Sequence, residues 1–438
     1  MQHNRKINLK KNNIPFFIFG KKQNFFLVVF IFIIFLIIFT CTYSTTFVYT
    51  APNNLFKNNQ ISGIVTVNQN LTSIRLEPKP FVATHISTPK SVKGIYMSAC
   101  VAATPSFRAK LVKLIDETEL NTVIIDIKDY SGTLSLDMED EFARDINITG
   151  GGCKVADMRD FIQSLHEKDI YVIGRITVFQ DPLYTKHYPA LAVKKASSIS
   201  TVWKDYKGLN FIDVGAKDYW KYIVEISRVS YKAGFDELNY DYIRFPSDGN
   251  MSDIYYPFSE ARITANPEFG KAEVLKDFFA YLYNEMKETK AVLSADLFGM
   301  TMTNADDLNI GQILEYAAPY FDFIAPMVYP SHYPSGFNGY QNVNSYPYEI
   351  VKYSMDEGIR RLTEMANSTT TSIGGRGSVS KDQLRPWLQD NDYPVVYTPA
   401  MVRAQIQATY DAGLDSWMLW DAGNTYTRAA LEITKETD

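Results

Sequence analysis

Histidine and cysteine are scarce in this chain of 438 residues, which contains five histidines and three cysteines. No histidines stand in an HxxxH or HxxE spacing, so a histidine-rich metal hydrolase is disfavoured, and we expect neither a metal nor an organic cofactor. So few cysteines also exclude a fold built on disulfides. Cys100 and Cys153 either pair in an oxidising compartment or stay free, and neither stands in a metal-ligand spacing.

Positive charge is in short supply beyond the N-terminus. The formal net charge of −5 becomes −11 when the six Lys and Arg residues before position 23 are left out. Nucleic-acid binding proteins need a basic surface to neutralise phosphates. A nucleic-acid partner is therefore not expected.

The N-terminus has no acidic residue before or within its apolar run at 25–39 (FFLVVFIFIIFLIIF). Basic residues ahead of such a run indicate a membrane segment with a cytoplasmic N-terminus. We therefore expect residues 1–48 to form a cytoplasmic basic segment and a transmembrane signal anchor, either retained or cleaved. Residues 49–90, rich in Asn, Thr, Ser and Pro, are interpreted as a stalk. The rest is then extracellular, held at the cell membrane by a single pass.

From residue 91 to 438, strand-like and helix-like runs alternate. This pattern predicts an α/β fold, a (β/α)8 TIM barrel with enlarged loops after its strands. The expected strands are 94–101, 122–128, 171–179, 235–245, 292–298, 321–329, a weak one at 384–388, and 416–420. The expected helices are 106–117, 155–167, 217–233, 271–289, 310–317, 348–365, 399–412 and 427–434.

The fourth expected strand, within GFDELNYDYIRFP, carries an unusual number of polar side chains. Because strand side chains alternate between faces, Glu237, Asn239 and Asp241 point one way, opposite to Leu238 and Tyr240. Active sites of TIM barrels lie at the carboxyl ends of the strands, where Asp241 stands. Alternatively, Asp241 has a purely structural role, either capping a loop or pairing with Arg244.

Other expected strands also end in polar or aromatic side chains. Several carboxylates meeting at one barrel mouth suit glycoside hydrolysis, in which one group protonates the leaving oxygen and another supports positive charge at the anomeric carbon. We expect the substrate-binding residues to be Asp126, Lys128, Arg175, Asn239, Tyr329, Trp420 and Asp421.

The catalytic candidates are Asp241, Asp296 and Glu237. Asp241 is assigned as nucleophile or charge stabiliser and Asp296 as proton donor, with Glu237 competing for the acid role. Neighbouring barrel strands bring such carboxyls near either the retaining or the inverting separation. The alternatives are that Asp296 caps a loop and that Glu237 is a buried partner of Arg175 or Lys128.

Six motifs together carry a family resemblance: KGIYMSACVA, VIIDIKDYSG, GFDELNYDYIRFP, SADLFGM, IAPMVYPSHY and DSWMLWDAGNTY. The chain resembles a glycoside hydrolase family of bacterial exported proteins, catalogued as a domain of unknown function within the α-amylase-like TIM barrels. The resemblance implies catalytic positions for Asp241 and Asp296 and cleft positions for Arg175 and Tyr329. The fourth strand is also similar to the chitinase strand FDGxDxDxE, but Ile243 and Arg244 replace its final Glu, which argues against a chitinase mechanism.

The sequence thus predicts a membrane-anchored extracellular glycoside hydrolase acting on a polysaccharide or oligosaccharide of the cell envelope or an exopolysaccharide. Two other functions remain open. The barrel either binds glycans without cleaving them or catalyses another hydrolase or lyase reaction on the same scaffold, because a fold does not fix a reaction.

Overall fold

The computed structural model describes residues 81–138, 141–368 and 375–434, all within the unit Pro78–Asp438. The expected signal anchor and most of the expected stalk lie outside these residues. Within the described part of the chain, no helix combines the length and the apolar character needed to cross a bilayer.

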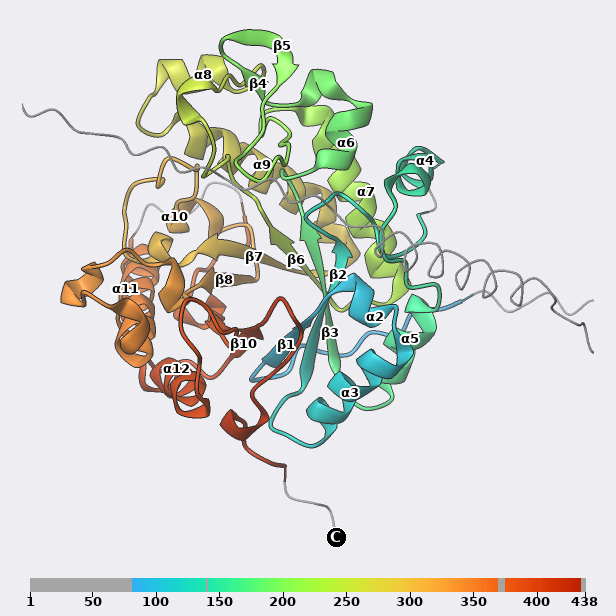
Figure 1. Ribbon diagram of the computed structural model, residues 1–438, viewed down its shortest axis with the longest axis vertical. Helices are drawn as coiled ribbons and strands as arrows, with labels where there is room; N and C mark the ends of the chain where they lie inside the picture. The colour runs from blue at the N-terminus through green and yellow to red at the C-terminus, as the bar shows by residue number, and fades with distance from the viewer. Residues whose placement is uncertain (1–80, 139–140, 369–374, 435–438) are drawn as a thin grey trace, which may run out of the picture. The chain divides into compact units, whose positions relative to one another are not determined.

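Eight strands close into a barrel in which every neighbouring pair is parallel, which confirms the TIM-barrel fold (Figure 1). The order around the barrel is β1-β10-β9-β8-β7-β6-β3-β2. In chain order the strands are β1 (Lys93–Met97), β2 (Thr122–Lys128), β3 (Tyr171–Thr177), β6 (Glu237–Asp241), β7 (Val292–Phe298), β8 (Phe323–Met327), β9 (Trp387–Gln389) and β10 (Trp417–Trp420).

Helices surround the barrel and connect its strands (Figure 1). They are α3 (Pro105–Asp116), α5 (Met158–His166), α7 (Lys217–Ala233), α9 (Gly270–Met286), α10 (Leu314–Ala317), α11 (Pro347–Asn367) and α12 (Pro399–Asp411). The end of α7 shows how the sequence fixes such a boundary. Gly234 adopts the left-handed conformation at φ 115°, which a side chain with a Cβ disfavours, and the helix stops there.

The loops after the strands are enlarged, as expected, and contain short elements of their own. These are α2 (Ala99–Ala102), α4 (Glu141–Gly150), α6 (Pro182–His187), the hairpin β4 (Lys194–Lys195) and β5 (Ser198–Val202), and α8 (Glu260–Ala265). A backbone bridge joins Lys194 to Tyr255, so the loops after β3 and β6 support one another. Figure 1 shows the hairpin, α6 and α8 together at the top of the view.

The side chains of β6 alternate as the sequence predicts. Leu238 and Tyr240 pack outward among the helices, where the Tyr240 hydroxyl lies 2.8 Å from Ser227 Oγ on α7. Glu237, Asn239 and Asp241 occupy the opposite face, inside the barrel, and all three are buried. The barrel interior therefore contains a column of polar groups beside apolar side chains such as Ile173 and Trp387.

Several expected elements differ from the structure. The strand expected at 94–101 ends at Met97, because Ser98 caps helix α2 there, and the strand expected at 235–245 is limited to Glu237–Asp241. The eighth helix, expected at 427–434, is only the short 3-10 helix η9 (Arg428–Ala430). The helix expected at 310–317 is reduced to α10, because Asn309 and Gly311 adopt positive φ angles and interrupt it. The weak seventh strand begins later than expected, at Trp387, although Leu384 already forms a bridge to Ile324.

The end of the expected stalk contacts the barrel. Ile86 N donates to Asp236 Oδ1 at 2.8 Å, and the hydroxyl of Thr88 lies 3.0 Å from that of Tyr171. Asp236 precedes β6 and Tyr171 begins β3, so this segment lies at the amino ends of the strands, opposite the active-site mouth of a TIM barrel.

Candidate active site

Arg175 lies at the centre of a buried group of charges near the carboxyl ends of the strands. Its Nη1 donates to Asp126 Oδ1 at 2.8 Å and its Nη2 to Asp241 Oδ2 at 2.5 Å. Its Nε lies 3.9 Å from Asp296 Oδ2. Burial alone lowers the pKa of Arg175, but the charges of Asp241 and Asp126 outweigh it and raise this pKa well above its ordinary value. One permanent positive charge thus faces three carboxyl groups.

Asp296 on β7 is almost fully buried, at 1% exposure. Its Oδ1 accepts hydrogen bonds from Asn239 Nδ2 at 2.9 Å and from Trp387 Nε1 at 2.8 Å. Burial, and next the negative charge of Asp241, raise the pKa of Asp296 well above its usual value, despite the opposing effect of Arg175. Asp296 is therefore a carboxyl group that keeps its proton to higher pH than an ordinary aspartate.

Asp241 ends β6 beside a strained residue. Its Oδ1 accepts a hydrogen bond from the backbone N of Tyr242 at 2.5 Å. Tyr242 has a φ of 52°, an outlier for a bulky side chain, and such strain is concentrated at functional sites. The sharp turn and the Arg175 ion pair together hold the Asp241 carboxylate at the barrel mouth.

Asp126 on β2 is the third carboxyl group of the site. Tyr96 donates its hydroxyl to Asp126 Oδ2 at 2.5 Å. Burial raises the pKa of Asp126, and Arg175 and Tyr96 offset this only in part. The register explains the grouping, since Asp126 is the direct neighbour of Arg175 across β2 and β3.

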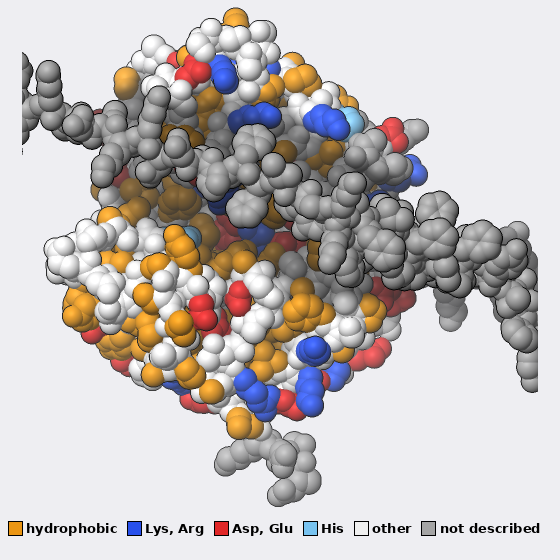
Figure 2. All heavy atoms as spheres, in the orientation of Figure 1, with side chains coloured by type: hydrophobic (Ala, Val, Ile, Leu, Met, Phe, Trp, Pro, Cys, Tyr) orange, Lys and Arg blue, Asp and Glu red, His pale blue; other side chains and the backbone are white. Residues whose placement is uncertain are grey.

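Two cavities open beside this group of charges. The inner one, about 180 Å³, is lined by Arg175, Asp241, Tyr242, Arg244, Asp296, Phe298, Met327, Tyr329, His332, Trp387 and Trp420. The outer one, about 570 Å³, is lined by Tyr96, Ser98, Ala99, Cys100, Asp126, Asp129, Tyr130, Arg175, Gln180, Asp205, Lys207, Leu209, Tyr242, Arg244, Asp248, Trp420 and Ala422. Four residues line both, so the cavities are two parts of one cleft. Figure 2 shows acidic and basic side chains together in the hollow at the centre of this face.

Aromatic rings form much of the cleft wall. Trp420 stacks on Tyr96 with ring centroids 4.3 Å apart, and its edge meets Trp387 at 5.8 Å. Tyr329 lies edge-on to His332 at 5.0 Å. Aromatic faces and edges of this kind present apolar surface next to the polar groups, which suits the apolar faces of sugars.

Two of the three catalytic candidates, Asp241 and Asp296, line the inner cavity, and their roles stay predictions. Glu237 does not reach either cavity, because it lies deep in the barrel with no exposed surface. Both of its oxygens accept from Arg385 Nη1, at 2.9 and 3.0 Å, and Oε2 also accepts from the Tyr171 hydroxyl at 3.1 Å. A buried partner for Glu237 was one of the sequence-based alternatives, but that partner is Arg385.

Of the substrate-binding candidates, Asp126, Arg175, Tyr329 and Trp420 line the cleft. Asn239 lies beneath it and positions Asp296. The other two candidates are placed elsewhere.

Lys128 is completely buried and lines neither cavity. Its Nζ donates to the Thr177 carbonyl at 2.7 Å and pairs with Asp181 at 2.9 Å. A register shift between Asp126 and Lys128 moves it out of line with the cleft. Asp421 accepts from the backbone N of Gly423 at 2.6 Å and so caps the loop after β10.

The sequence did not predict that Trp387, Tyr96, Tyr242 and His332 line the cleft. It suggested Arg244 only as a partner for Asp241. The structure gives Asp241 a different partner, Arg175. The side chain of Arg244 instead lines both cavities. Its position directly after the strand of Asp241 was the available signal.

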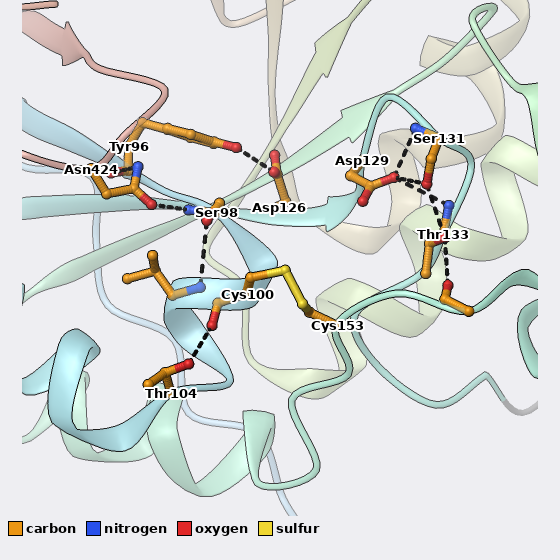
Figure 3. Close-up of a disulfide and its surroundings, with 12 residues drawn as sticks. Tyr96, Ser98, Cys100, Thr104, Asp126, Asp129, Ser131, Thr133, Cys153 and Asn424 are labelled. Carbon is orange, nitrogen blue, oxygen red and sulfur yellow. Dashed lines mark hydrogen bonds between the residues drawn. A yellow bond between two sulfur atoms is a disulfide. The ribbon is translucent and has the colours of Figure 1, made fainter. Parts of the chain in front are cut away.

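Cys100 and Cys153 form a disulfide in the wall of the outer cavity, with Cα atoms 4.8 Å apart. Figure 3 shows this bond near the hydrogen bond between Tyr96 and Asp126. It ties α2, which follows β1, to the chain just before α5. Among the described residues, no group of three or more His, Cys, Asp or Glu side chains has the arrangement of a metal site.

This geometry can perform acid and base chemistry. It holds one carboxyl group, Asp296, whose proton is retained, next to a carboxylate, Asp241, that is paired with a guanidinium. Two titratable groups with environments that differ in this way mark acid and base roles.

Comparison with known proteins agrees with this picture at the level of fold and family. The glycoside hydrolase domain of PgaB (BpsB) from Bordetella bronchiseptica is 14% identical, with a TM-score of 0.53 over 77% of this chain and 95% of that one. A hypothetical protein from Ruminiclostridium thermocellum is 30% identical over 46% of this chain and 96% of its own, with a TM-score of 0.39. The glycoside hydrolase domain of PelA from Pseudomonas aeruginosa is 12% identical over 77% and 97%, with a TM-score of 0.40.

No curated protein matches the chain. A family match, however, extends over residues 94–426, which is nearly the whole barrel and includes every side chain of the cleft. The chain belongs to the family described as "Putative glycosyl hydrolase domain".

Proposed function

We propose that this protein is a glycoside hydrolase that cleaves a glycan with Asp296 as the general acid and Asp241 as the nucleophile or charge stabiliser. The observation that carries the proposal is the pair itself. Asp296 and Asp241 line one small cavity, one carboxyl group has a raised pKa, and the other is paired with Arg175. Family membership and the fold shared with a glycoside hydrolase domain support the same reaction class.

In the proposed reaction, Asp296 gives its proton to the glycosidic oxygen as the bond to the anomeric carbon breaks. Asp241 faces the positive charge that develops on that carbon. It either bonds to the carbon or directs a water molecule to it, and the separation of the two carboxyl groups decides which. Both groups contact the same guanidinium, so their separation is of the order of the roughly 5.5 Å or 6.5–9.5 Å that glycosidases use.

Arg175 serves this reaction as a positioning residue. It holds Asp241 and Asp126 in fixed directions through two charge-assisted hydrogen bonds. Asn239 and Trp387 hold Oδ1 of Asp296, which leaves Oδ2 to carry the proton. Trp420 and Tyr329 are the proposed sugar platforms.

We further propose that the substrate is a cell-envelope or exopolysaccharide glycan outside the cell. Two features support this location. The disulfide between Cys100 and Cys153 is typical of an oxidising compartment. The basic and apolar N-terminal sequence is typical of a signal anchor that would keep the barrel at the membrane.

The test is to incubate the full chain with a panel of bacterial polysaccharides and to measure released reducing ends and oligosaccharide masses. We expect cleavage of at least one polymer by the wild type and a loss of turnover in both Asp241→Asn and Asp296→Asn. Undiminished turnover in both variants would end the assignment. A polymer that is retained but never cut would instead indicate a glycan-binding barrel, and unsaturated products would indicate a lyase.

A further inference from the structure

We propose that Arg244 binds an anionic substituent of the glycan, a carboxylate or a phosphate group, on a sugar next to the cleaved bond. The inference rests on the glycan-binding part of the proposed function and specifies the class of substrate. It concerns a residue that has no part in the proton transfer.

Arg244 is more than nine-tenths buried, at 8% exposure, and yet it lines both cavities. Its Nη1 donates to the carbonyl of Phe245 at 3.1 Å. In the part of the chain that the structure describes, no carboxylate lies within ion-pair distance of it, and its Nε and Nη2 have no acceptor. Arg175, which lines the same two cavities, forms ion pairs with Asp126 and Asp241.

The Arg244 guanidinium is held in place by aromatic rings. Its Cζ lies 4.8 Å from the ring centre of Tyr242 and 5.0 Å from that of Phe298. Such contacts fix the plane of the guanidinium without using its N–H donors. The free edge of the group is therefore preorganised for a ligand.

An unpaired buried charge is costly to maintain. Burial lowers the pKa of Arg244, and the charges of nearby Tyr242, Asp241, Asp248 and Asp205 offset this only in part, because none of these carboxylates pairs with the guanidinium. A buried cation that is retained without a partner is readily explained when a ligand supplies the missing anion. The planar fork of an arginine matches carboxylate and phosphate oxygens, each of which accepts two parallel hydrogen bonds.

The outer cavity is lined by carboxylates as well as by cations. Lys207 also lines the outer cavity and forms no ion pair with a described carboxylate, and its charge reinforces the effect of burial in lowering the pKa of His332. Lys207 is exposed, so water screens its charge, and the proposal rests on the buried Arg244.

The carboxylates of the outer cavity are mostly occupied. Asp126 is held by Arg175 and Tyr96. Asp129 accepts from the backbone N and the hydroxyl of Ser131.

The other two carboxylates of that wall are Asp205 and Asp248. Asp205 accepts from two backbone N–H groups, at 2.9 and 2.7 Å. Asp248 is exposed, so water screens its charge. Asp129 and Asp205 are thus each held by the protein through Oδ1, and Asp248 is screened, whereas the buried Arg244 guanidinium has a single backbone acceptor and no ion pair among the described residues.

The position of Arg244 also predicts where the anion lies on the substrate. Asp241 and Asp296 line the inner cavity alone, and the outer cavity extends away from them. Arg244 stands where the two cavities meet. The acidic group therefore belongs to a sugar unit at the cleaved bond or one unit beyond it.

The experiment measures binding rather than turnover, so that it is independent of the catalytic assignment. The full chain carrying Asp296→Asn is titrated with neutral, amino-sugar, uronic-acid and phosphate-substituted bacterial polysaccharides by calorimetry. Each acidic polymer that binds is tested again after carboxyl reduction or dephosphorylation. These two arms distinguish a carboxylate from a phosphate.

We expect an acidic polymer to bind and the chemically neutralised form to bind about 10- to 100-fold more weakly, the usual effect of losing charge-assisted hydrogen bonds. Adding Arg244→Met should cause the same loss for the acidic form and little change for the neutralised form. Arg244→Lys should recover only part of the loss, because it keeps the charge but not the fork. Arg360→Met, on the exposed face of α11, is the matched control and should change nothing.

Binding of neutral or amino-sugar polymers alone, or of none of the acidic ones, would overturn the inference. Equal binding of acidic and neutralised forms would also overturn it, and this comparison needs no variant of Arg244. Cleavage of a neutral polymer by the wild type would leave the proposed function standing while the inference fails. Binding of an acidic polymer through Arg244 without any cleavage by the wild type would support the inference and contradict the proposed hydrolase function.

Discussion

The barrel interior contains two buried groups of charges, one near each end, and they differ in composition. Near the amino ends of the strands, Glu237 is matched by a single arginine, Arg385, and neither is more than 1% exposed. Near the carboxyl ends, Arg175 faces Asp126, Asp241 and Asp296. The first group balances one positive with one negative charge. The second has more carboxyl groups than one guanidinium can neutralise.

This difference separates a structural ion pair from the group of charges that we propose to be catalytic. In the balanced pair, neither charge is available to a substrate, and Glu237 lines neither part of the cleft. In the unbalanced group, burial raises the pKa of both Asp296 and Asp126, so these two groups next to a cavity keep their protons to higher pH than ordinary aspartates do. A surplus of carboxyl groups at a cavity is thus the feature that marks the site, rather than burial of charge as such.

The largest expected effect is on turnover at the unbalanced group. Asp296→Asn removes the proposed general acid and should lower kcat by about 10²- to 10⁴-fold, with the melting temperature maintained. The measurement is the initial rate on a cleaved polymer together with a thermal melt. A loss of turnover that only follows unfolding would contradict the catalytic role.

At the balanced pair the expected effect is on stability instead. Glu237→Gln leaves Arg385 buried without its counter-charge, which typically costs about 3–5 kcal/mol of unfolding free energy. Urea titration measures this, and kcat of the folded protein should be unchanged. Glu237→Leu combined with Arg385→Met should recover most of the loss, because an apolar pair needs no desolvation of charge. A turnover defect at full stability would return Glu237 to the acid role.

A smaller effect is expected in the pH profile when a hydrogen bond to the acid is removed. Trp387→Phe takes away an N–H donor that favours the ionised form of Asp296. The pKa of the acid should rise further, and the alkaline limb of kcat/KM should move up by about 1–2 pH units. Trp220→Phe removes a similar indole bond, to the Val214 carbonyl on the outside of the barrel, and is the control. If the alkaline limb of kcat/KM did not move in Trp387→Phe, Asp296 would not be the group whose ionisation determines that limb.

The smallest expected effect is on the pH dependence of stability at the unbalanced group. Because the folded-state pKa of Asp296 is raised, its favourable contribution is complete below the unfolded value of about 3.9 and is lost as pH rises through the folded value. Asp296→Asn should therefore gain stability relative to the wild type between pH 4 and pH 7. Denaturant titrations at both pH values measure the change, with exposed Asp382→Asn as a flat control. A difference that falls with pH would reverse the assigned shift.

The sequence predicted the barrel and the core of the site for a physical reason. Strand and helix patterns alternate, and the carboxyl ends of parallel strands meet at one mouth, so Asp241, Asp296 and Arg175 were expected together. The register of β3 against β6 brings Arg175 near Asp241, and the register of β6 against β7 brings Asp296 beside them.

Depth along the barrel was not predictable in the same way. Glu237 and Asp241 share a face of β6, but they are four residues apart, about 13 Å along the strand. Glu237 therefore lies near the amino-terminal end of the barrel, whereas Asp241 lies at its mouth. Lys128 was lost from the site because of the register shift after Asp126. Trp387 was missed because its strand is only three residues long and shows no alternating pattern.

The most direct test of the account is the titration of Asp296 itself, which needs no substrate. Carboxyl ¹³C NMR of aspartate-labelled protein, with the signal assigned by its absence in Asp296→Asn, gives the pKa at this position. The geometry predicts that Asp296 titrates well above the ordinary value of about 3.9 and shifts upward again in Trp387→Phe. A signal that titrates at or below that value would contradict the proposed acid and, with it, the catalytic pair.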